Sequence, residues 1–196
     1  MEKEYFWFVA IVTPNTELKC ETRLDSLVKA WKNKNIIDPS EEVTTFVPVH
    51  KDIRIRPSSG KRVKVIKILS TCYVFIRCTE SVRYRISCEA KFILHFLMNR
   101  ASKTTLGKND FARIPEDQMQ NFRLMVEKAQ SEIVIDPSRL RVGDKVRIKT
   151  GSLEGLECNV YQESDGSTML ALHVDFLGYA KIKCPSDLLS LIKNDD

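Results

Sequence analysis

The 196-residue chain lacks the features of several large protein classes. Its longest run of apolar and aromatic residues is Tyr5–Val12, eight residues, whereas a membrane span needs roughly 18 or more. The first residues, Met1-Glu2-Lys3-Glu4, have neither the basic start nor the cleavage site of a signal peptide. We therefore expect a cytoplasmic protein that does not enter a membrane.

The chain is also poor in the spacings that catalysis and metal binding require. Its six cysteines show no C-x-x-C or paired Cys and His spacing, and its three histidines lie far apart. We expect buried free thiols and structural histidines rather than zinc ligands or a disulfide framework. No Gly-rich phosphate loop or nucleophile motif occurs. The sequence therefore indicates a non-enzymatic protein with no cofactor and no metal.

Positive charge is present and unevenly placed. The net charge is +5, and residues 1–138 hold 23 Lys and Arg against 17 Asp and Glu. Residues 139–196 hold 8 against 9. The basic excess of the first part predicts a polyanionic neighbour there.

The first 130 residues alternate between strand and helix patterns. Tyr5–Val12 is an apolar run of strand length, and apolar residues from Leu18 to Trp31 recur at spacings of three and four, which predicts a helix. Further strands are expected at 43–49, 63–69, 72–78 and 91–98, a short helix at 81–89, and a longer helix from Pro115 to about 130. This order predicts an α+β domain over residues 1–130, with helices on a mostly antiparallel sheet.

The pattern changes beyond this domain. Residues 131–139 have no periodicity and contain Asp136-Pro137-Ser138, which predicts a linker. Short strands separated by Gly-containing turns are then expected at 142–149, 156–162, 169–176 and 179–184. They predict a small β-barrel domain over residues 140–196.

The stretch from Val142 to Leu156, VGDKVRIKTGSLEGL, closely resembles the KOW motif. Val146 and Ile148 are expected to point into the barrel, and Gly151 and Gly155 to permit a tight loop. The family usually has a further glycine where Cys158 stands. KOW barrels occur in ribosomal proteins as well as in elongation factors, so the motif alone does not identify the function.

The first domain looks like the N-terminal domain of the NusG family. The elements that carry this resemblance follow in the family's order: Trp7-Phe8, a helix ending near Trp31, Phe46-Val47-Pro48, a basic hairpin, Tyr73-Val74-Phe75-Ile76 and Ile114-Pro115-Glu116. The resemblance covers the chain from about Tyr5 to Ile192. It implies a NusG N-terminal domain, a KOW (SH3-like) barrel and the function of a transcription elongation factor. The Phe-Val-Pro element and the long hairpin look more like specialised antiterminators, such as RfaH and the capsule-operon group.

The resemblance also implies that an apolar depression of the first domain docks on the clamp helices of RNA polymerase and suppresses pausing and termination. The matching positions are Ile11, Ser70, Tyr73, Phe75 and Phe96. Ser70-Thr71-Cys72 stands where the family commonly has Phe-Pro-Gly or Phe-Pro-Asn, so Ser70 replaces an aromatic contact. Alternatively, Tyr73 and Phe75 share one face of a strand as plain core residues.

Seven Lys and Arg residues and one acid, Asp52, lie between His50 and Lys67. A hairpin of this density can follow a phosphate backbone, and the alternative is a solvated edge whose charge prevents aggregation. The resemblance adds Lys19, Arg23 and Lys91, which match positions that meet non-template DNA in the antiterminators. With nascent RNA as a second possible ligand, the candidate nucleic-acid-binding residues are Lys19, Arg23, Lys51, Arg54, Arg56, Lys61, Arg62, Lys64 and Lys91.

In the barrel, the resemblance implies a partner-binding loop at Phe176-Leu177-Gly178, which docks onto a ribosomal protein or a termination factor. The same turn is equally compatible with packing of the barrel. The rival function is a KOW-containing RNA-binding or ribosome-associated protein, and a third class is a pure protein adaptor. In each case we expect a monomer.

Overall fold

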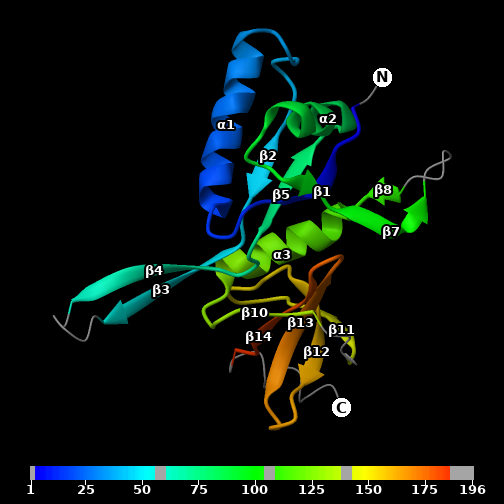
Figure 1. Cartoon of the computed structure of the whole chain (residues 1–196). Coiled ribbons are helices and arrows are strands. Elements are labelled where there is room, and N and C mark those ends of the chain that lie inside the picture. The colour runs from blue at the N-terminus through cyan, green and yellow to red at the C-terminus, as the bar shows by residue number, and fades with distance from the viewer. Residues whose placement is uncertain (1–2, 56–60, 104–108, 138–142, 186–196) are drawn as a thin grey trace. The chain divides into compact units, whose positions relative to one another are not determined.

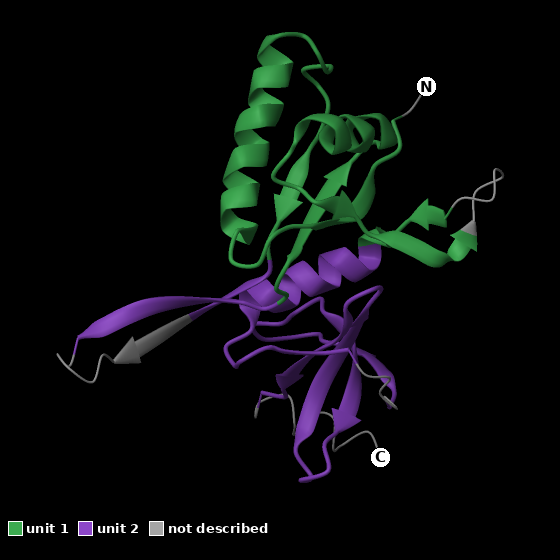
Figure 2. Cartoon of the chain, viewed as in Figure 1, with its two compact units in different colours: residues 1–47, 70–116 green, residues 48–69, 117–196 purple. Residues whose placement is uncertain are grey.

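The computed structural model describes residues 3–55, 61–103, 109–137 and 143–185, with the backbone alone at 52–55 and 103 (Figure 1). The chain forms two compact units (Figure 2). Unit 1 comprises residues 1–47 and 70–116, and unit 2 comprises residues 48–69 and 117–196. The described residues contain three helices and four antiparallel sheets. The expected mixture of helices with antiparallel sheets is thus confirmed.

Unit 1 is built around a five-stranded antiparallel sheet. Four strands follow the order β2-β5-β1-β6, and β9 also pairs with β1. The strands β7 and β8 form a separate two-stranded ribbon. The elements of unit 1 are β1 (Phe6–Ile11), α1 (Glu17–Asn33), β2 (Thr44–Phe46), β5 (Tyr73–Cys78), α2 (Glu80–Glu89), β6 (His95–Phe96), β7 (Met98–Lys103), β8 (Asn109–Phe111) and β9 (Arg113–Ile114).

The central strand β1 is buried along most of its length, as its continuous apolar sequence predicts. It pairs with β5 over six residues, from Phe6 opposite Cys78 to Ile11 opposite Tyr73. Side chains directly opposite each other in an antiparallel pair lie on the same face of the sheet. One face therefore carries Phe8, and the other carries Ile11 and Tyr73.

The helix α2 is linked to α1 and to the face of the sheet that carries Phe8. The indole Nε1 of Trp31 in α1 donates to Glu89 Oε2 in α2 at 2.9 Å. The buried guanidinium of Arg83 in α2 lies 3.6 Å from the ring centre of Phe111 and 5.8 Å from that of Phe8. Its nitrogen Nη2 donates to Glu80 Oε1 at 2.6 Å. A buried charge of this kind is tolerated because rings and a carboxylate surround it.

Unit 2 contains a second five-stranded antiparallel sheet with the order β10-β14-β13-β12-β11. The strands β3 and β4 form a hairpin that pairs with no other described strand. The elements are β3 (Val49–Ile55), β4 (Arg62–Ile68), α3 (Glu116–Lys128, whose first residue belongs to unit 1), β10 (Val134–Asp136), β11 (Lys145–Arg147), β12 (Glu157–Gln162), β13 (Thr168–Val174) and β14 (Gly178–Lys183).

The helix α3 is bonded to the sheet of unit 2 through two polar side chains. The backbone N–H of Glu157 donates to Asn121 Oδ1, and that of Asp175 donates to Gln118 Oε1, both at 2.8 Å. This helix was expected to be the last element of the first domain, which was predicted to end at residue 130. In the structure, the helix belongs to unit 2 from Asp117 onward. The expected linker 131–139 also contributes β10, which is too short to show periodicity.

The loop after β11 has the backbone that the KOW-like sequence predicts. Gly151 and Gly155 have φ angles of 88° and 87°, which a side chain disfavours. The N–H of Gly155 donates to the carbonyl of Ile148 at 2.9 Å. Leu156 is buried at the end of the loop. Cys158 is buried opposite Val146, so the position of the expected further glycine lies inside a regular strand pair.

Among the strand predictions that were wrong in their bounds, two have a local cause. The strand expected at 43–49 is divided between β2 and β3, because Pro48 has no N–H to donate to a ladder. The strand expected at 91–98 begins only at His95, because the N–H of Ile93 donates back to the carbonyl of Ala90 and forms a turn.

The six cysteines are free thiols, and Cys88 is the one that is exposed. Burial raises the pKa of Cys20, Cys78 and Cys158 to about 12. These three thiols are therefore protonated at neutral pH and act as small apolar side chains.

The turn between β13 and β14 depends on a glycine, and a second glycine provides a matched control. Both Gly178 and Gly166 have positive φ angles, but a Cβ on Gly178 would lie 2.4 Å from the carbonyl oxygen of Asp136, whereas one on Gly166 meets nothing within 4 Å. We predict that Gly166→Ala lowers the free energy of unfolding by about 1 kcal/mol, from backbone strain alone. Gly178→Ala should cost about 3 kcal/mol or more, because it adds the clash with backbone atoms. Urea unfolding followed by circular dichroism gives both values, and equal midpoint shifts would contradict the prediction.

Candidate protein-docking and nucleic-acid-binding surfaces

The end of the β1–β5 pair brings two of the predicted docking residues together. Ile11 and Tyr73 are direct partners across the two strands, and both are half-buried. His95 pairs with Ile11 from β6 and is exposed, and the half-buried Phe46 pairs with Phe75 from β2. We call Ile11, Phe46, Tyr73 and His95 the β1–β5 surface. Its members combine apolar area with a phenol and an imidazole, which suits contact with a protein.

The other three predicted docking residues have different surroundings. Phe75 is 0% exposed, and its ring centre lies 6.1 Å from that of Phe46. Phe96 is 3% exposed and lies on the opposite face, where its ring meets Phe8 edge to face. Ser70 is also buried. Phe75 shares the face of Ile11 and Tyr73 and packs beside the β1–β5 surface, whereas Phe96 packs on the opposite face, where Arg83 of α2 lies.

The predicted basic residues of α1 share a small surface with an aromatic ring. Lys19 and Arg23 are exposed and lie one helical turn apart. The guanidinium of Arg23 lies 5.3 Å above the ring centre of Phe92, which follows the exposed Lys91. The structure therefore gathers Lys19, Arg23, Phe92 and Lys91, which we call the α1 patch. Phe92 was not predicted, because its contact with α1 depends on the turn that precedes β6.

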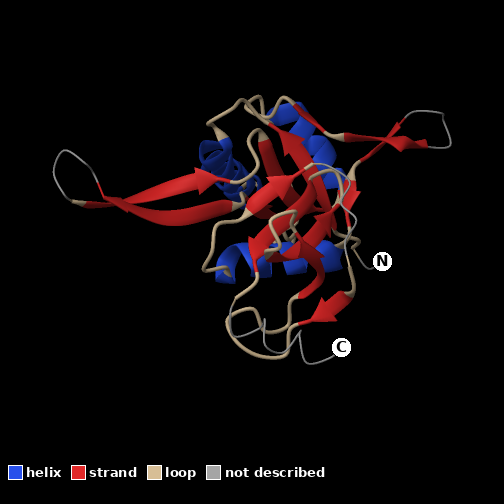
Figure 3. Ribbon diagram, turned by 90° about the horizontal axis from the view of Figure 1, so that it is seen from below, coloured by secondary structure: helices blue, strands red, loops and turns tan. Residues whose placement is uncertain are grey.

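The basic hairpin β3–β4 forms as predicted, with Val49 opposite Ile68 and Ile55 opposite Arg62 (Figure 3). Its charges alternate between the two faces of the ribbon. Lys51, Arg62 and Lys64 occupy positions on one face, and Lys61 and Lys67 occupy positions on the other. A phosphate backbone can therefore meet positive charge on either face.

Most of the described hairpin cations are available to a ligand. The side chains of Lys51, Lys61, Arg62 and Lys64 are exposed and form no ion pair with any described residue. Lys67 differs because its ammonium is paired with Glu132 of the same unit. The side chain of Arg54 and the whole of Arg56 lie outside the described residues.

The predicted partner loop forms the turn between β13 and β14. Phe176 has a positive φ angle of 67° and is 39% exposed, while Leu177 is buried. The N–H of Leu177 donates to the carbonyl of Val174 at 3.1 Å. Gly178 is required by the approach of Asp136 and Pro137. Phe176 is thus the member of the loop that can reach a partner, and the other two shape the turn.

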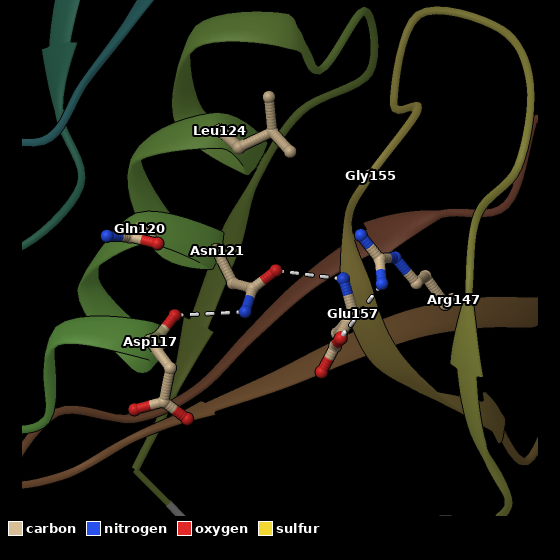
Figure 4. A pocket seen from close by; sticks show the side chains of 7 residues that line it. All are labelled: Asp117, Gln120, Asn121, Leu124, Arg147, Gly155 and Glu157. Carbon is tan, nitrogen blue, oxygen red and sulfur yellow. Dashed lines mark hydrogen bonds and ion pairs between the residues drawn. The ribbon is translucent and has the colours of Figure 1, made fainter.

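A shallow hollow of about 260 Å³ lies between α3 and the β11–β12 pair of unit 2 (Figure 4). Asn121 crosses it by accepting a hydrogen bond from the N–H of Glu157. The carboxylate of Glu157 also holds Lys145 at 2.9 Å, and this bond raises the pKa of Lys145 and lowers that of Glu157. The polar groups of the hollow therefore largely satisfy one another. The lining residues are Asp117, Gln120, Asn121, Leu124, Arg147, Gly155 and Glu157.

Within the described residues, no three His, Cys, Asp or Glu side chains are grouped so that they could hold a metal ion. No helix among these described residues is long and apolar enough to cross a membrane.

Comparison with known proteins finds likeness among solved structures. No family model and no curated protein matches the sequence. Among solved structures, the chain is similar to NusG of Thermotoga maritima, in a structure described as "Domain interaction in Thermotoga maritima NusG". The TM-score is 0.47 and the sequences are 14% identical, over 92% of this chain and 93% of that chain.

Proposed function

We propose that this chain is a non-enzymatic transcription elongation factor of the NusG type, in the manner of the operon-restricted antiterminators. Unit 1 binds the clamp of RNA polymerase through the β1–β5 surface and suppresses pausing and termination. The KOW-like sheet of unit 2 recruits a further partner, either a ribosomal protein or a termination factor, through Phe176.

The observation that carries this proposal is the pairing of Ile11 with Tyr73, both half-buried, at the end of the β1–β5 ladder. A tyrosine with apolar neighbours is a frequent anchor of protein interfaces, because it adds a large contact area and a hydrogen bond at a small entropic cost. Phe75, on the same face of β5, is fully buried beside Tyr73. The KOW-like loop after β11 supports the same assignment, because glycines, Gly151 and Gly155, occupy its two positions with positive φ angles.

The two basic surfaces supply the nucleic-acid part of the proposal. The α1 patch joins two cations to an aromatic ring, a combination that binds single strands by phosphate attraction and base stacking. The basic hairpin adds exposed Lys and Arg residues on both faces of a ribbon. Non-template DNA and nascent RNA both present such single strands, and phosphate contacts alone do not select a sequence.

The second candidate is a KOW-containing RNA-binding or ribosome-associated protein. One observation favours it: the basic hairpin belongs to the same compact unit as the KOW-like sheet. A basic ribbon beside such a sheet can bind structured RNA without polymerase. The pure adaptor remains the outcome in which neither nucleic acid binds.

The docking proposal is tested with a tyrosine variant and a tyrosine control. We predict that Tyr73→Ala weakens binding to the host's core RNA polymerase about 30-fold, which corresponds to the loss of a contact worth about 2 kcal/mol. Tyr84→Ala should leave the affinity unchanged, because Tyr84 lies on α2 and is 65% exposed. Biolayer interferometry with full-length proteins gives both affinities. No binding by the wild type would direct attention to the RNA-binding candidate.

The role of the hairpin is tested by neutralising two of its exposed cations. We expect Arg62→Gln/Lys64→Gln to weaken binding to single-stranded DNA and to lower the slope of log K against log salt by about 1.4, from two lost phosphate contacts. The matched control, Lys29→Gln/Lys34→Gln, removes the same charge from exposed positions at the end of α1 and immediately after it. Equal slopes for both variants would identify the hairpin charge as a solvated edge. Tight binding to structured RNA without polymerase would support the second candidate.

A further inference from the structure

The turn that leads into Tyr73 has an unusual backbone for its sequence. Cys72 has a φ angle of 69°, in the left-handed region that favours glycine. Both of its backbone polar groups are engaged. Its N–H donates to Glu17 Oε1 at 2.7 Å, and its carbonyl accepts from the N–H of Val12 at 2.9 Å.

A left-handed backbone costs a residue with a Cβ roughly tenfold in population, whereas glycine adopts it freely. Cysteine also lacks the short polar side chain with which asparagine or aspartate bonds locally in this region. An external interaction must therefore hold Cys72 in place. The structure provides two hydrogen bonds, from the N–H of Val12 and to the carboxylate of Glu17, and bonds to carboxylates are the stronger kind.

Glu17 is placed for this role. It is the first residue of α1 and is 0% exposed. Its second carboxylate oxygen, Oε2, has no hydrogen-bond partner among the described residues. A buried carboxylate is costly unless its bonds compensate. Its other oxygen, Oε1, accepts the hydrogen bond from the turn, 55 residues away in sequence.

The position of this turn decides where Tyr73 lies. The ladder between β1 and β5 ends at Ile11 and Tyr73, and the bond from Val12 to Cys72 extends it by one step. Because side chains alternate between the faces of a strand, a slip of one residue here would move Tyr73 to the other face.

We propose that Glu17 is a positioning residue for partner docking: it holds Cys72 in the left-handed region and thereby keeps Tyr73 beside Ile11 on the β1–β5 surface. The proposal rests on the proposed function for its docking part. Its structural part stands on unit 1 alone.

The structural part is tested by a double-mutant cycle with Glu17→Ala and Cys72→Gly in the full chain. Both tryptophans, Trp7 and Trp31, belong to unit 1, so tryptophan fluorescence in urea follows the unfolding of this unit. We expect Glu17→Ala to lower the folding equilibrium constant at least tenfold in the wild-type background. In the Cys72→Gly background the loss should be about threefold, because glycine needs no help to keep the turn. Equal losses in both backgrounds would overturn the proposal.

The docking part is tested by polymerase affinity in the same four proteins. Glu17→Ala should bind at least tenfold more weakly, and adding Cys72→Gly should restore the affinity to within about threefold of the wild type. Cys20→Ala serves as a control, because Cys20 is a buried α1 residue and its substitution leaves both partners of the bond between Cys72 and Glu17 in place. A folded Glu17→Ala protein with wild-type affinity, or a loss that Cys72→Gly does not restore, would overturn the proposal.

The two parts fail in different ways. If the wild type and Tyr73→Ala bind polymerase equally poorly, the proposed function is wrong, and the fluorescence cycle still decides the role of Glu17. If Tyr73→Ala loses binding but Glu17→Ala does not, the function stands and the positioning role is wrong.

Discussion

The pairing of β1 with β5 is the constraint on which the rest of unit 1 depends. Six residues of each strand are in register, and each pair assigns two side chains to a common face. Phe8 and Ile76 are placed toward Arg83 of α2, and Ile11 and Tyr73 are placed on the opposite face. A slip of one residue would exchange these two sets and disrupt the packing on both faces of the sheet. The same register thus determines both the packing of the unit and the composition of its candidate docking surface.

Local patterns predicted most of the elements, and partners distant in sequence determined the rest. The apolar run of β1, the periodicity of α1 and the basic hairpin are visible in short windows of sequence, and each forms where it was expected. The burial of Phe75 was not visible in that way, because Tyr73 and Phe75 have the same spacing and face. Their difference arises from Phe46, which packs against the ring of Phe75 and comes from another part of the chain. The place of Phe96 likewise follows from its pairing with Ala10.

The division into units likewise depends on contacts between residues that are distant in sequence. The helix α3 was predicted correctly as a helix, and its association with the sheet of unit 2 rests on Gln118 and Asn121, whose bonds to Asp175 and Glu157 have no signature in the sequence. The strand β10 is three residues long and lies in a segment that looked like a linker. The KOW-like loop was predictable because glycines with positive φ angles leave a direct trace in the sequence.

The candidate surfaces differ in their chemical character. The β1–β5 surface is apolar and aromatic, the α1 patch combines cations with Phe92, and the hairpin carries exposed cations on both faces. An elongation factor that contacts both a protein and a single strand needs such a division, because apolar anchors give affinity for the protein and phosphate contacts give orientation on the nucleic acid. The function proposed for the chain is the joint use of these surfaces on a transcribing polymerase.

Single-round transcription by the host's purified RNA polymerase, on a template with a strong pause and an intrinsic terminator, tests this claim most directly. The account predicts that the full-length protein shortens the pause and increases readthrough at the terminator. Unchanged pause duration and readthrough at saturating protein would contradict it.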